Sequence, residues 1–203
     1  MKHLLTFLAT LLLSPLVVHA QSQKPELVAE DGGVQERGSS RVLYWNPRAD
    51  TALGQFAFDY GRPVWKKEYE DPAKFDAMTK GKVWRFGKDF WTSLDTQLAL
   101  KIGGREVAPG CYYLALHRSP DGTTWSLAFI DPAKVRKSRL DAFQIERAPI
   151  EFRIPMALEQ TGEVAEKLTV TLAYAKEKPK DVRLRIAWGK IRLVVPIQVS
   201  VGS

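Results

Sequence analysis

The sequence predicts an all-β protein: an antiparallel β-sandwich or open barrel with one or two short helices. Apolar and polar side chains alternate in several short runs, and only an extended chain places successive side chains on opposite faces. Residues typical of tight turns separate these runs, and signals for helices are sparse. Short antiparallel strands bury their apolar faces by packing one sheet against another, which is how sandwiches and barrels are built.

Seven segments carry the strand pattern. In four of them, apolar residues alternate strictly with their neighbours: Phe56, Phe58 and Tyr60; Leu98, Leu100 and Ile102; Tyr112, Leu114 and Leu116; and Trp125, Leu127 and Phe129. Three further strands are expected over residues 168–174, 182–188 and 191–199. Pro196 lies inside the last of these, and its missing N–H predicts an edge strand or a bulge there.

Turns and helices follow from glycine and proline. Four reversals are expected, at Gly103-Gly104, Pro109-Gly110, residues 120–122 and Gly189-Lys190, because glycine adopts positive φ without steric cost. Asp71-Pro72 is a good N-cap and first-turn pair, which predicts a short helix over residues 72–79. Asp131-Pro132 opens a second helical stretch, over residues 133–143.

The first twenty residues have the pattern of a cleaved export signal. Lys2 is followed by an apolar stretch over residues 4–18, and short residues precede a cleavage site after Ala20. We therefore expect a protein exported to the periplasm or secreted, with a signal peptide over 1–20, a flexible arm over 21–40 and a single β-sandwich domain over 41–203. The apolar stretch is too short to span a membrane, and no second one follows, so no transmembrane anchor is expected.

Composition narrows the partners. Hydrophobic residues make up 45% and charged residues 26% of the chain, which is ordinary for a globular protein. Without its leader the chain has 29 basic and 23 acidic residues, and this excess favours polyanions such as acidic polysaccharides or lipid headgroups. The sequence has no basic helix, metal-finger spacing or RNA-binding motif, so nucleic acid is not an expected partner.

Residues for catalysis are scarce. His117 is the one histidine outside the leader, and multi-histidine metal sites need two or three such ligands, so neither a metal nor a cofactor is expected. His117 lies six positions after Cys111 on one strand, roughly 20 Å away, which is too far for a catalytic pair. A hydrolase that uses two carboxylates remains an alternative, with candidates at Asp59, Asp89, Asp95, Asp121, Asp131 and Glu151.

Aromatic and basic residues alternate with glycines over residues 81–92. Flat rings bury the apolar face of a sugar at low entropy cost, and arginine supplies forked hydrogen-bond donors. The candidate binding surface is Arg62, Trp84, Arg85, Lys88 and Trp91. The alternative is that these rings only seal one end of the sandwich, because aromatic residues dominate cores.

A second basic feature is a row of three arginines, Arg183, Arg185 and Arg192. The row has two interpretations: binding of an anionic polymer, or the solvated face of a sheet whose charges deter aggregation.

Several motifs, in their order and spacing, resemble a known family. They are Tyr60-Gly61-Arg62-Pro63, residues 83–87, Ile102-Gly103-Gly104, residues 109–112 and the closing strands over 184–197. Together they resemble the exported bacterial family catalogued as domain of unknown function 2911, over roughly residues 41–199. The resemblance implies export, a β-rich domain and no established activity or cofactor. The chain departs from the family pattern at residues 86–90, where Thr-Gly-Ala-Asn-Glu is usual.

These observations lead to one main hypothesis and two alternatives. We expect an exported, non-catalytic β-sandwich that binds a glycan or another cell-envelope component through its aromatic and basic surface. The first alternative is a carboxylate-dependent, glycosidase-like hydrolase. The second is a structural envelope protein held to an anionic polymer by charge alone.

Overall fold

The computed structural model describes residues 27–29, 33–160 and 162–202, and all of its helices and strands lie in the unit Val34–Ser203. The first six strands are β1 (Arg37–Asn46), β2 (Thr51–Gly61), β3 (Val83–Trp84), β4 (Thr92–Thr96), β5 (Ala99–Ile102) and β6 (Arg105–Val107). The other six are β7 (Gly110–Arg118), β8 (Trp125–Ile130), β9 (Ile150–Leu158), β10 (Ala165–Ala173), β11 (Asp181–Gly189) and β12 (Ile191–Ser200). The helices are η1 (Lys67–Glu70), α1 (Pro72–Thr79), α2 (Pro132–Lys137) and η2 (Ala142–Arg147).

The strands form one antiparallel sheet folded into two halves, which confirms the all-β prediction. The path runs β1-β2-β4-β7-β8-β9-β12-β11-β10, and among the described strands β1 and β10 are its two open ends. Strand β9 belongs to both halves: Trp125 to Ile130 of β8 pair with its first part, and Leu158 at its end pairs with Leu193 of β12. The sheet therefore changes direction along β9, as in an open barrel.

The main core lies between the two halves. Phe56 and Phe58 of β2 face it together with Leu184 and Ile197 of β11 and β12, and all four are fully buried. This is the face that the alternation in the sequence predicts, because residues two apart share one side of a strand.

A second, smaller cluster covers the opposite face of β7 and β8. Ala115 and Ala128 lie there under Val135 of α2 and Ile145 of η2. Strand β8 is thus buried on both faces: Leu127 and Phe129 point into the main core, and Ala128 and Ile130 into the second cluster. The helices are needed because this outer face would otherwise expose apolar side chains.

Pro196 does not mark an edge strand. Strand β12 has β11 along one side and both β9 and β5 along the other. On that second side β9 pairs as far as Val194 and β5 begins at Ile197, so Pro196 sits at the junction. Its carbonyl accepts a hydrogen bond from the Gly103 N–H at 2.8 Å. The missing proline N–H falls where no ladder partner faces it, so a central strand tolerates the residue.

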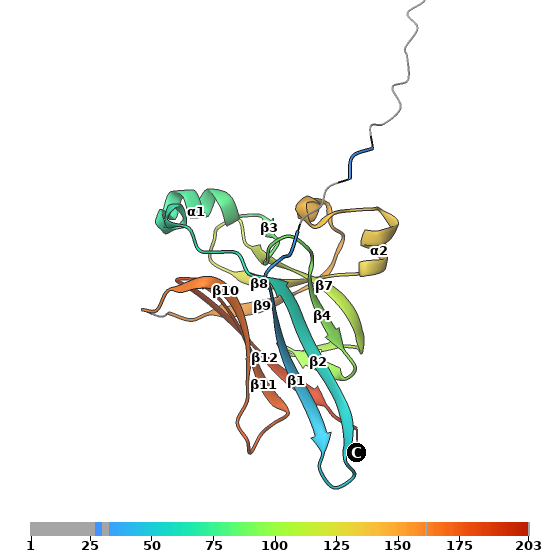
Figure 1. The fold of residues 1–203 in the computed structure, drawn as a ribbon. Coiled ribbons are helices and arrows are strands. Elements are labelled where there is room, and N and C mark those ends of the chain that lie inside the picture. Colours follow the sequence, from blue (N-terminus) through green and yellow to red (C-terminus); the bar gives the residue numbers. More distant parts are fainter. Residues whose placement is uncertain (1–26, 30–32, 161, 203) are drawn as a thin grey trace, which may run out of the picture. The chain divides into compact units, whose positions relative to one another are not determined.

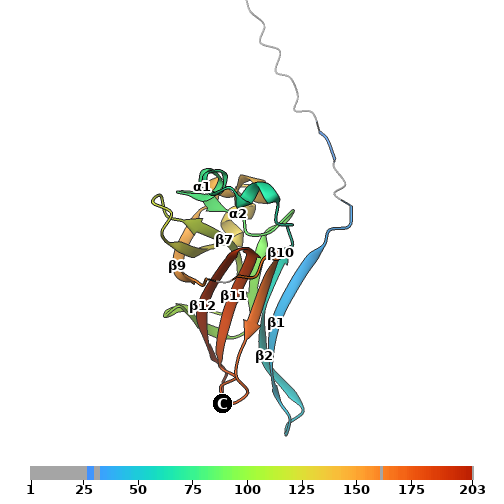
Figure 2. The same ribbon diagram turned by 90° about the vertical axis from the view of Figure 1, so that its left-hand side faces the viewer.

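Both helical regions lie at one end of the folded unit, and the β1–β2 turn lies at the other (Figures 1 and 2). At the helical end the chain that follows β2 pairs with β10. Trp65 N–H donates to the Glu166 carbonyl at 2.6 Å, and Leu168 N–H donates to the Pro63 carbonyl at 3.0 Å. The two halves of the sheet are therefore joined at this end, where the candidate site also lies.

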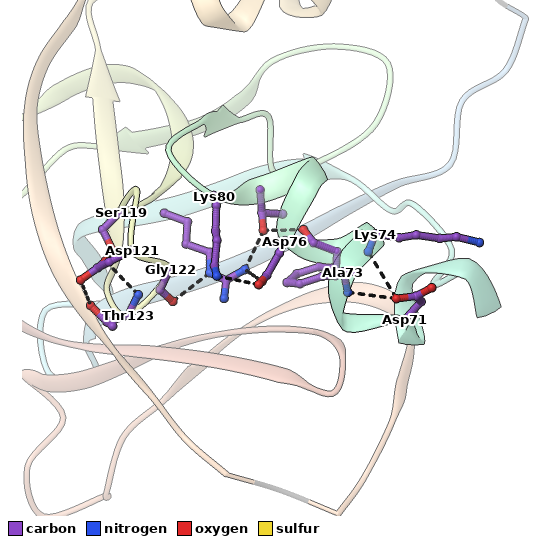
Figure 3. Close-up of polar contacts among 12 residues, drawn as sticks. Asp71, Ala73, Lys74, Asp76, Lys80, Ser119, Asp121, Gly122 and Thr123 are labelled. Carbon is purple, nitrogen blue, oxygen red and sulfur yellow. Dashed lines mark hydrogen bonds and ion pairs between the residues drawn. The ribbon is translucent and has the colours of Figure 1, made fainter.

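Helix α1 matches the predicted bounds and is held at both ends (Figure 3). The Asp71 carboxylate accepts from Ala73 N–H at 2.9 Å as the N-cap. Asp76 forms ion pairs with Lys80 at 2.6 Å and with Arg118 of β7 at 2.7 Å.

Arg118 also donates to the Gly122 carbonyl at 3.0 Å, which ties the helix to the turn over residues 119–123. Ser119 and Thr123 bond the Asp121 carboxylate in that turn, and the pKa of Asp121 falls to about 2.

The other segment boundaries differ in part from the prediction. Strand β1 begins at Arg37, within the stretch expected to be an arm, and residues 37–40 pair with the end of β2. The second helical stretch is divided into α2 and η2, and Arg139 between them has a φ of +52°. The predicted leader over 1–20 and residues 21–26 and 30–32 of the predicted arm lie outside the described residues. Within the described part of the chain, no helix has the length and hydropathy needed to cross a membrane.

Candidate functional site

A groove of about 540 Å³ opens at the end of the sandwich where α1, β3 and the chain after β2 converge. Its lining includes Arg62 to Val64, Tyr69 of η1, Met78 of α1, Trp84 of β3, Lys88 and Trp188 of β11. These residues come from segments that are far apart along the chain. The groove therefore depends on the pairing of β2, β10 and β11 described above.

Two stacked indoles form the floor of the groove. The rings of Trp84 and Trp188 have centroids 4.8 Å apart and planes inclined by 25°. Trp188 is 4% exposed and its Nε1 donates to the Pro63 carbonyl at 3.1 Å. Trp65 meets Trp188 edge-on, with centroids 4.8 Å apart. Because Trp188 belongs to the main core, the half-buried Trp84 above it rests on a rigid base.

Two glycines allow the chain to approach this floor closely. Gly189 has a φ of +56°, and a Cβ on it would overlap the Trp65 ring. A Cβ on Gly61 would overlap the backbone of Lys88. Both positions favour glycine because they have no room for a side chain, and the first also requires a left-handed backbone.

Four cationic side chains surround the floor: Arg62, Lys66, Arg85 and Lys88. The Arg62 Nε donates to the Leu168 carbonyl at 3.3 Å, which orients its guanidinium. Lys66 and Lys88 have side chains that are 63% and 51% exposed. Lys66 pairs with Glu68 at 3.5 Å and Lys88 with Asp89 at 3.6 Å. Because both lysines are largely exposed, a ligand can compete for their ammonium groups at little desolvation cost.

Glu36 is the one acidic residue among the described residues that line the groove. Its carboxylate pairs with Lys167 at 2.9 Å and with Arg62 at 3.4 Å. The hydrogen bond from Lys167 lowers the pKa of Glu36, and the charges of Arg62 and Lys88 act in the same direction. Glu36 therefore remains ionised at neutral pH and partly offsets the positive charge of the groove.

Arg85 is held more firmly than the lysines. Its Nη1 donates to the Asp89 carbonyl at 2.9 Å, and Asp89 has a φ of +65°. Partial burial lowers the pKa of Arg85, and it still remains charged because an arginine pKa lies far above neutrality. The guanidinium also lies 4.3 Å from the ring centroid of Phe143. Arg85 is thus a fixed cation at the border of the groove.

The structure brings together four of the five residues proposed from the sequence. Arg62, Trp84, Arg85 and Lys88 all line the groove. Trp91 lies elsewhere, stacked on Tyr113 with centroids 5.0 Å apart and planes inclined by 5°, against the second apolar cluster. The chain turns between Trp84 and Trp91 through left-handed residues at Gly87 and Asp89, so the two indoles do not share a face.

The sequence reasoning missed the groove residues that come from distant elements. Tyr69 and Met78 supply apolar walls, Trp188 supplies part of the floor, and Glu36 supplies the carboxylate. The N-cap signal at Asp71 placed Met78 on a helix, and alternation placed Trp188 on a strand. Neither signal indicates which surface the residue faces, because that depends on the pairing of strands distant in sequence.

The carboxylates considered for hydrolysis mostly have structural partners. Asp59 is paired with Arg37, Asp121 lies in its turn, and Asp131 caps α2 by accepting from Ala133 N–H at 2.8 Å. Asp131 and Glu151 line a separate hollow of about 380 Å³, and Glu151 pairs with Lys134 at 2.7 Å. The aromatic groove itself therefore offers one carboxylate from the described residues, whereas that chemistry uses two.

Cys111 and His117 lie on opposite halves of β7, in agreement with the expected separation. Burial lowers the pKa of His117, and the positive charge of Arg153 adds to this effect. The described residues contain no cluster of three or more His, Cys, Asp or Glu side chains placed to hold a metal ion.

The arginine row is divided between two environments. Arg183 and Arg185 on the exposed face of β11 both pair with Glu159, the second at 3.6 Å. Arg192 is 9% exposed and donates to the carbonyls of Gly189 and Ile191 at 3.0 Å. Arg183 and Arg185 thus have the pairing of a solvated sheet face, and Arg192 ties the β11–β12 hairpin. Arg185 and Arg192 also line a hollow of about 220 Å³ together with Glu159 and Glu163.

The family described as "Protein of unknown function (DUF2911)" matches residues 47–197. The chain belongs to this family. The matched DUF2911 region contains all five residues proposed from the sequence and every groove residue named above except Glu36. The chain matches no curated protein and no solved structure.

Proposed function

We propose that this DUF2911 protein is a non-catalytic binding protein that holds a glycan of the cell envelope in the aromatic groove. The observation that supports this most is the groove itself: a stacked indole floor, Trp84 on Trp188, bordered by four cations. Its volume of about 540 Å³ lies within the usual range of ligand sites, which is about 300–1,000 Å³.

The chemistry of the walls suits a sugar ring that carries polar or acidic groups. The flat face of Trp84 can cover the C–H face of the ring, which buries apolar area without ordering a flexible side chain. Arg62 and Lys88 stand beside it and can donate hydrogen bonds to hydroxyl or carboxylate oxygens. No covalent step is required of any of these groups.

Binding to soluble glycans, with peptidoglycan fragments as the envelope probe, tests the proposal. The purified protein is titrated with peptidoglycan fragments, oligogalacturonates and malto-oligosaccharides, and the dissociation constant is measured by calorimetry. We expect at least one class to bind, and Trp84→Ala to weaken that binding about tenfold or more, which corresponds to ~1.4 kcal/mol. The matched control is Trp45→Ala, because Trp45 is a 49% exposed tryptophan on β1 that does not line the groove.

A second variant separates loss of binding from loss of folding. Lys88→Ala changes a half-exposed side chain and leaves the indole floor intact. We expect it to weaken binding severalfold at an unchanged melting temperature. Absence of binding by the wild-type protein to every glycan class, or full binding by both variants, would overturn the proposal. Binding that disappears between low and physiological salt in all variants alike would instead favour attachment by charge alone.

We also propose that the protein is exported, as its first twenty residues suggest. Expression of the full chain in a Gram-negative host should yield a periplasmic product that begins at Gln21, as measured by N-terminal sequencing. Replacement of the small residue at the cleavage position, Ala20→Arg, should leave the leader attached. An unprocessed wild-type protein in the cytoplasm would contradict this localisation.

A further inference from the structure

A smaller hollow of about 210 Å³ adjoins the groove and shares three of its residues, Trp84, Arg85 and Gly87. Its other wall comes from η2, through Ala142, Phe143 and Ile145. We refer to it as the side hollow. On its own it is smaller than the usual range of ligand sites, about 300–1,000 Å³. Since it meets the groove at Trp84 and Arg85, it is better explained as an extension of the groove than as a separate site.

Phe143 gives the side hollow an aromatic surface of its own. Its side chain is 72% exposed, whereas its neighbours Ala142 and Ile145 are buried, the latter in the second cluster. The backbone is held in place because Phe143 N–H donates to the Asp141 carboxylate at 2.8 Å in a capping box. The Arg85 guanidinium, 4.3 Å from the ring centroid, adds a cation–π contact. Phe143 is therefore an exposed ring with a fixed position.

Charge indicates what kind of ligand fits. Arg62, Lys66 and Lys88 lie in the groove and Arg85 at its border with the side hollow, against the single carboxylate of Glu36. That carboxylate is already neutralised by its pairs with Lys167 and Arg62. Lys66 and Lys88 also pair, with Glu68 and Asp89, and Arg85 lies near Asp89 and Asp141. The five cations named here, Lys167 included, therefore lie among four named carboxylates, and the remaining positive charge favours an acidic ligand that can compete for the exposed lysines.

From this arrangement we infer that the ligand is an acidic oligosaccharide of at least two rings. One ring stacks on Trp84 with its carboxylate among Arg62, Lys66 and Lys88, and the next passes Arg85 and lies on Phe143. This inference rests on the proposed glycan binding and adds the charge and the length of the ligand. It gives Phe143 a role that the sequence had not assigned.

The test compares ligand length and charge. Galacturonic acid and its dimer, trimer and tetramer are titrated into the wild-type protein, with malto-oligosaccharides of equal length as neutral probes. We expect affinity to rise at least tenfold from the monomer to the trimer, and the acidic trimer to bind at least tenfold more tightly than the neutral one. Phe143→Ala should bind the monomer as the wild type does and lose most of the gain with length.

Phe90→Ala is the matched control, because Phe90 is another exposed phenylalanine, 61% accessible, that lies next to an arginine and does not line the groove or the side hollow. It should keep the full gain with length, and Phe143→Trp should also keep it. Equal affinity for monomer and trimer, or a gain that survives in Phe143→Ala, would overturn the extended ligand while glycan binding stands. Equal affinity for acidic and neutral trimers would overturn the acidic character. Absence of any binding would remove the proposed function as well.

Discussion

Trp84 lies stacked on Trp188, with the ring centroids 4.8 Å apart, and this pair connects the candidate site to the core. Trp188 is buried between the two halves of the sheet and is bonded through its Nε1 to Pro63. Trp84 is half-buried and faces the groove. A ligand on Trp84 would thus meet a surface ordered by the fold itself, which reduces the entropy cost of binding.

The two tryptophans proposed together from the sequence should behave differently. Trp91→Ala should lower the free energy of unfolding by about 2–3 kcal/mol, less than the roughly 3–5 kcal/mol of fully buried aromatic truncations, because Trp91 is only half-buried. It should leave glycan affinity unchanged at temperatures where the variant is folded. Urea unfolding and calorimetry at 15 °C measure the two quantities. A tenfold loss of affinity in folded Trp91→Ala would contradict the separation of the two rings.

Gly189→Ala should distort the groove by displacing Trp65, which packs against Trp188 of the floor. The added methyl would overlap the Trp65 ring, and the φ of +56° costs a non-glycine residue roughly 1–2 kcal/mol by itself. We expect a loss of stability above that figure and weaker glycan binding, because Trp65 supports Trp188. The control is Gly104→Ala, where φ is +86° and the added methyl meets open space. Gly104→Ala should lose stability only and bind normally; equal binding by both variants would show that Trp65 does not support the floor.

Glu36→Gln should strengthen binding of acidic ligands. The Glu36 carboxylate occupies Lys167 and Arg62, so its neutralisation frees two cations. At pH 7 we expect the affinity for the galacturonate trimer to rise about two- to fivefold, which is the size of an exposed ion-pair effect. The gain should fade in about 0.5 M salt, because salt screens exposed charges. The control is Glu106→Gln, which removes the charge of the Glu106 carboxylate on β6 that pairs with Lys101 of β5. A lower affinity in Glu36→Gln would mean that Glu36 helps to hold the ligand.

The pairing of Asp76 predicts a pH-dependent contribution to stability. The hydrogen bond from Lys80 and then that from Arg118 lower the pKa of Asp76 below its ordinary value of 3.8. A lowered pKa means that the folded state binds the proton less readily. The stabilisation is therefore complete above pH 3.8 and is lost as the pH falls through the lowered pKa.

Asp76→Asn should thus melt a few degrees below the wild type at pH 7. The difference should shrink as the pH falls below 3.8 through the lowered pKa, because the wild-type carboxylate then loses its charge. Thermal unfolding monitored by circular dichroism across this range gives the measurement. Asp95→Asn, on the exposed side of β4, serves as the control. A gap that stays constant with pH would show that Asp76 acts through its hydrogen bonds rather than its charge.

Some features were readable from local sequence because their causes are local. Alternation placed Phe56 and Phe58 on a buried face, the Asp71-Pro72 pair placed the start of α1, and Gly103-Gly104 placed a hairpin turn with two positive φ values. Strand β9 was missed although Ile150, Phe152, Ile154 and Met156 alternate with polar residues and Pro155, so its signal was present. Strand β3 has only two residues and gave no periodic signal.

The sequence by itself determined the all-β class, since period-two patterning and turn residues act over a few positions. Its motifs, in their order and spacing, resemble the family that the comparison shows, and its aromatic and basic pattern proposed four residues that line the candidate groove. Tertiary structure alone decided that Trp84 lies on Trp188, that Trp91 packs on the far face of β7, and that Phe143 borders the same groove. The reason is physical: these contacts depend on the pairing of β10 with the chain after β2 and on the left-handed turns at Gly87 and Asp89. Side-chain alternation does not encode which distant strands pair, so it does not specify a surface built between them.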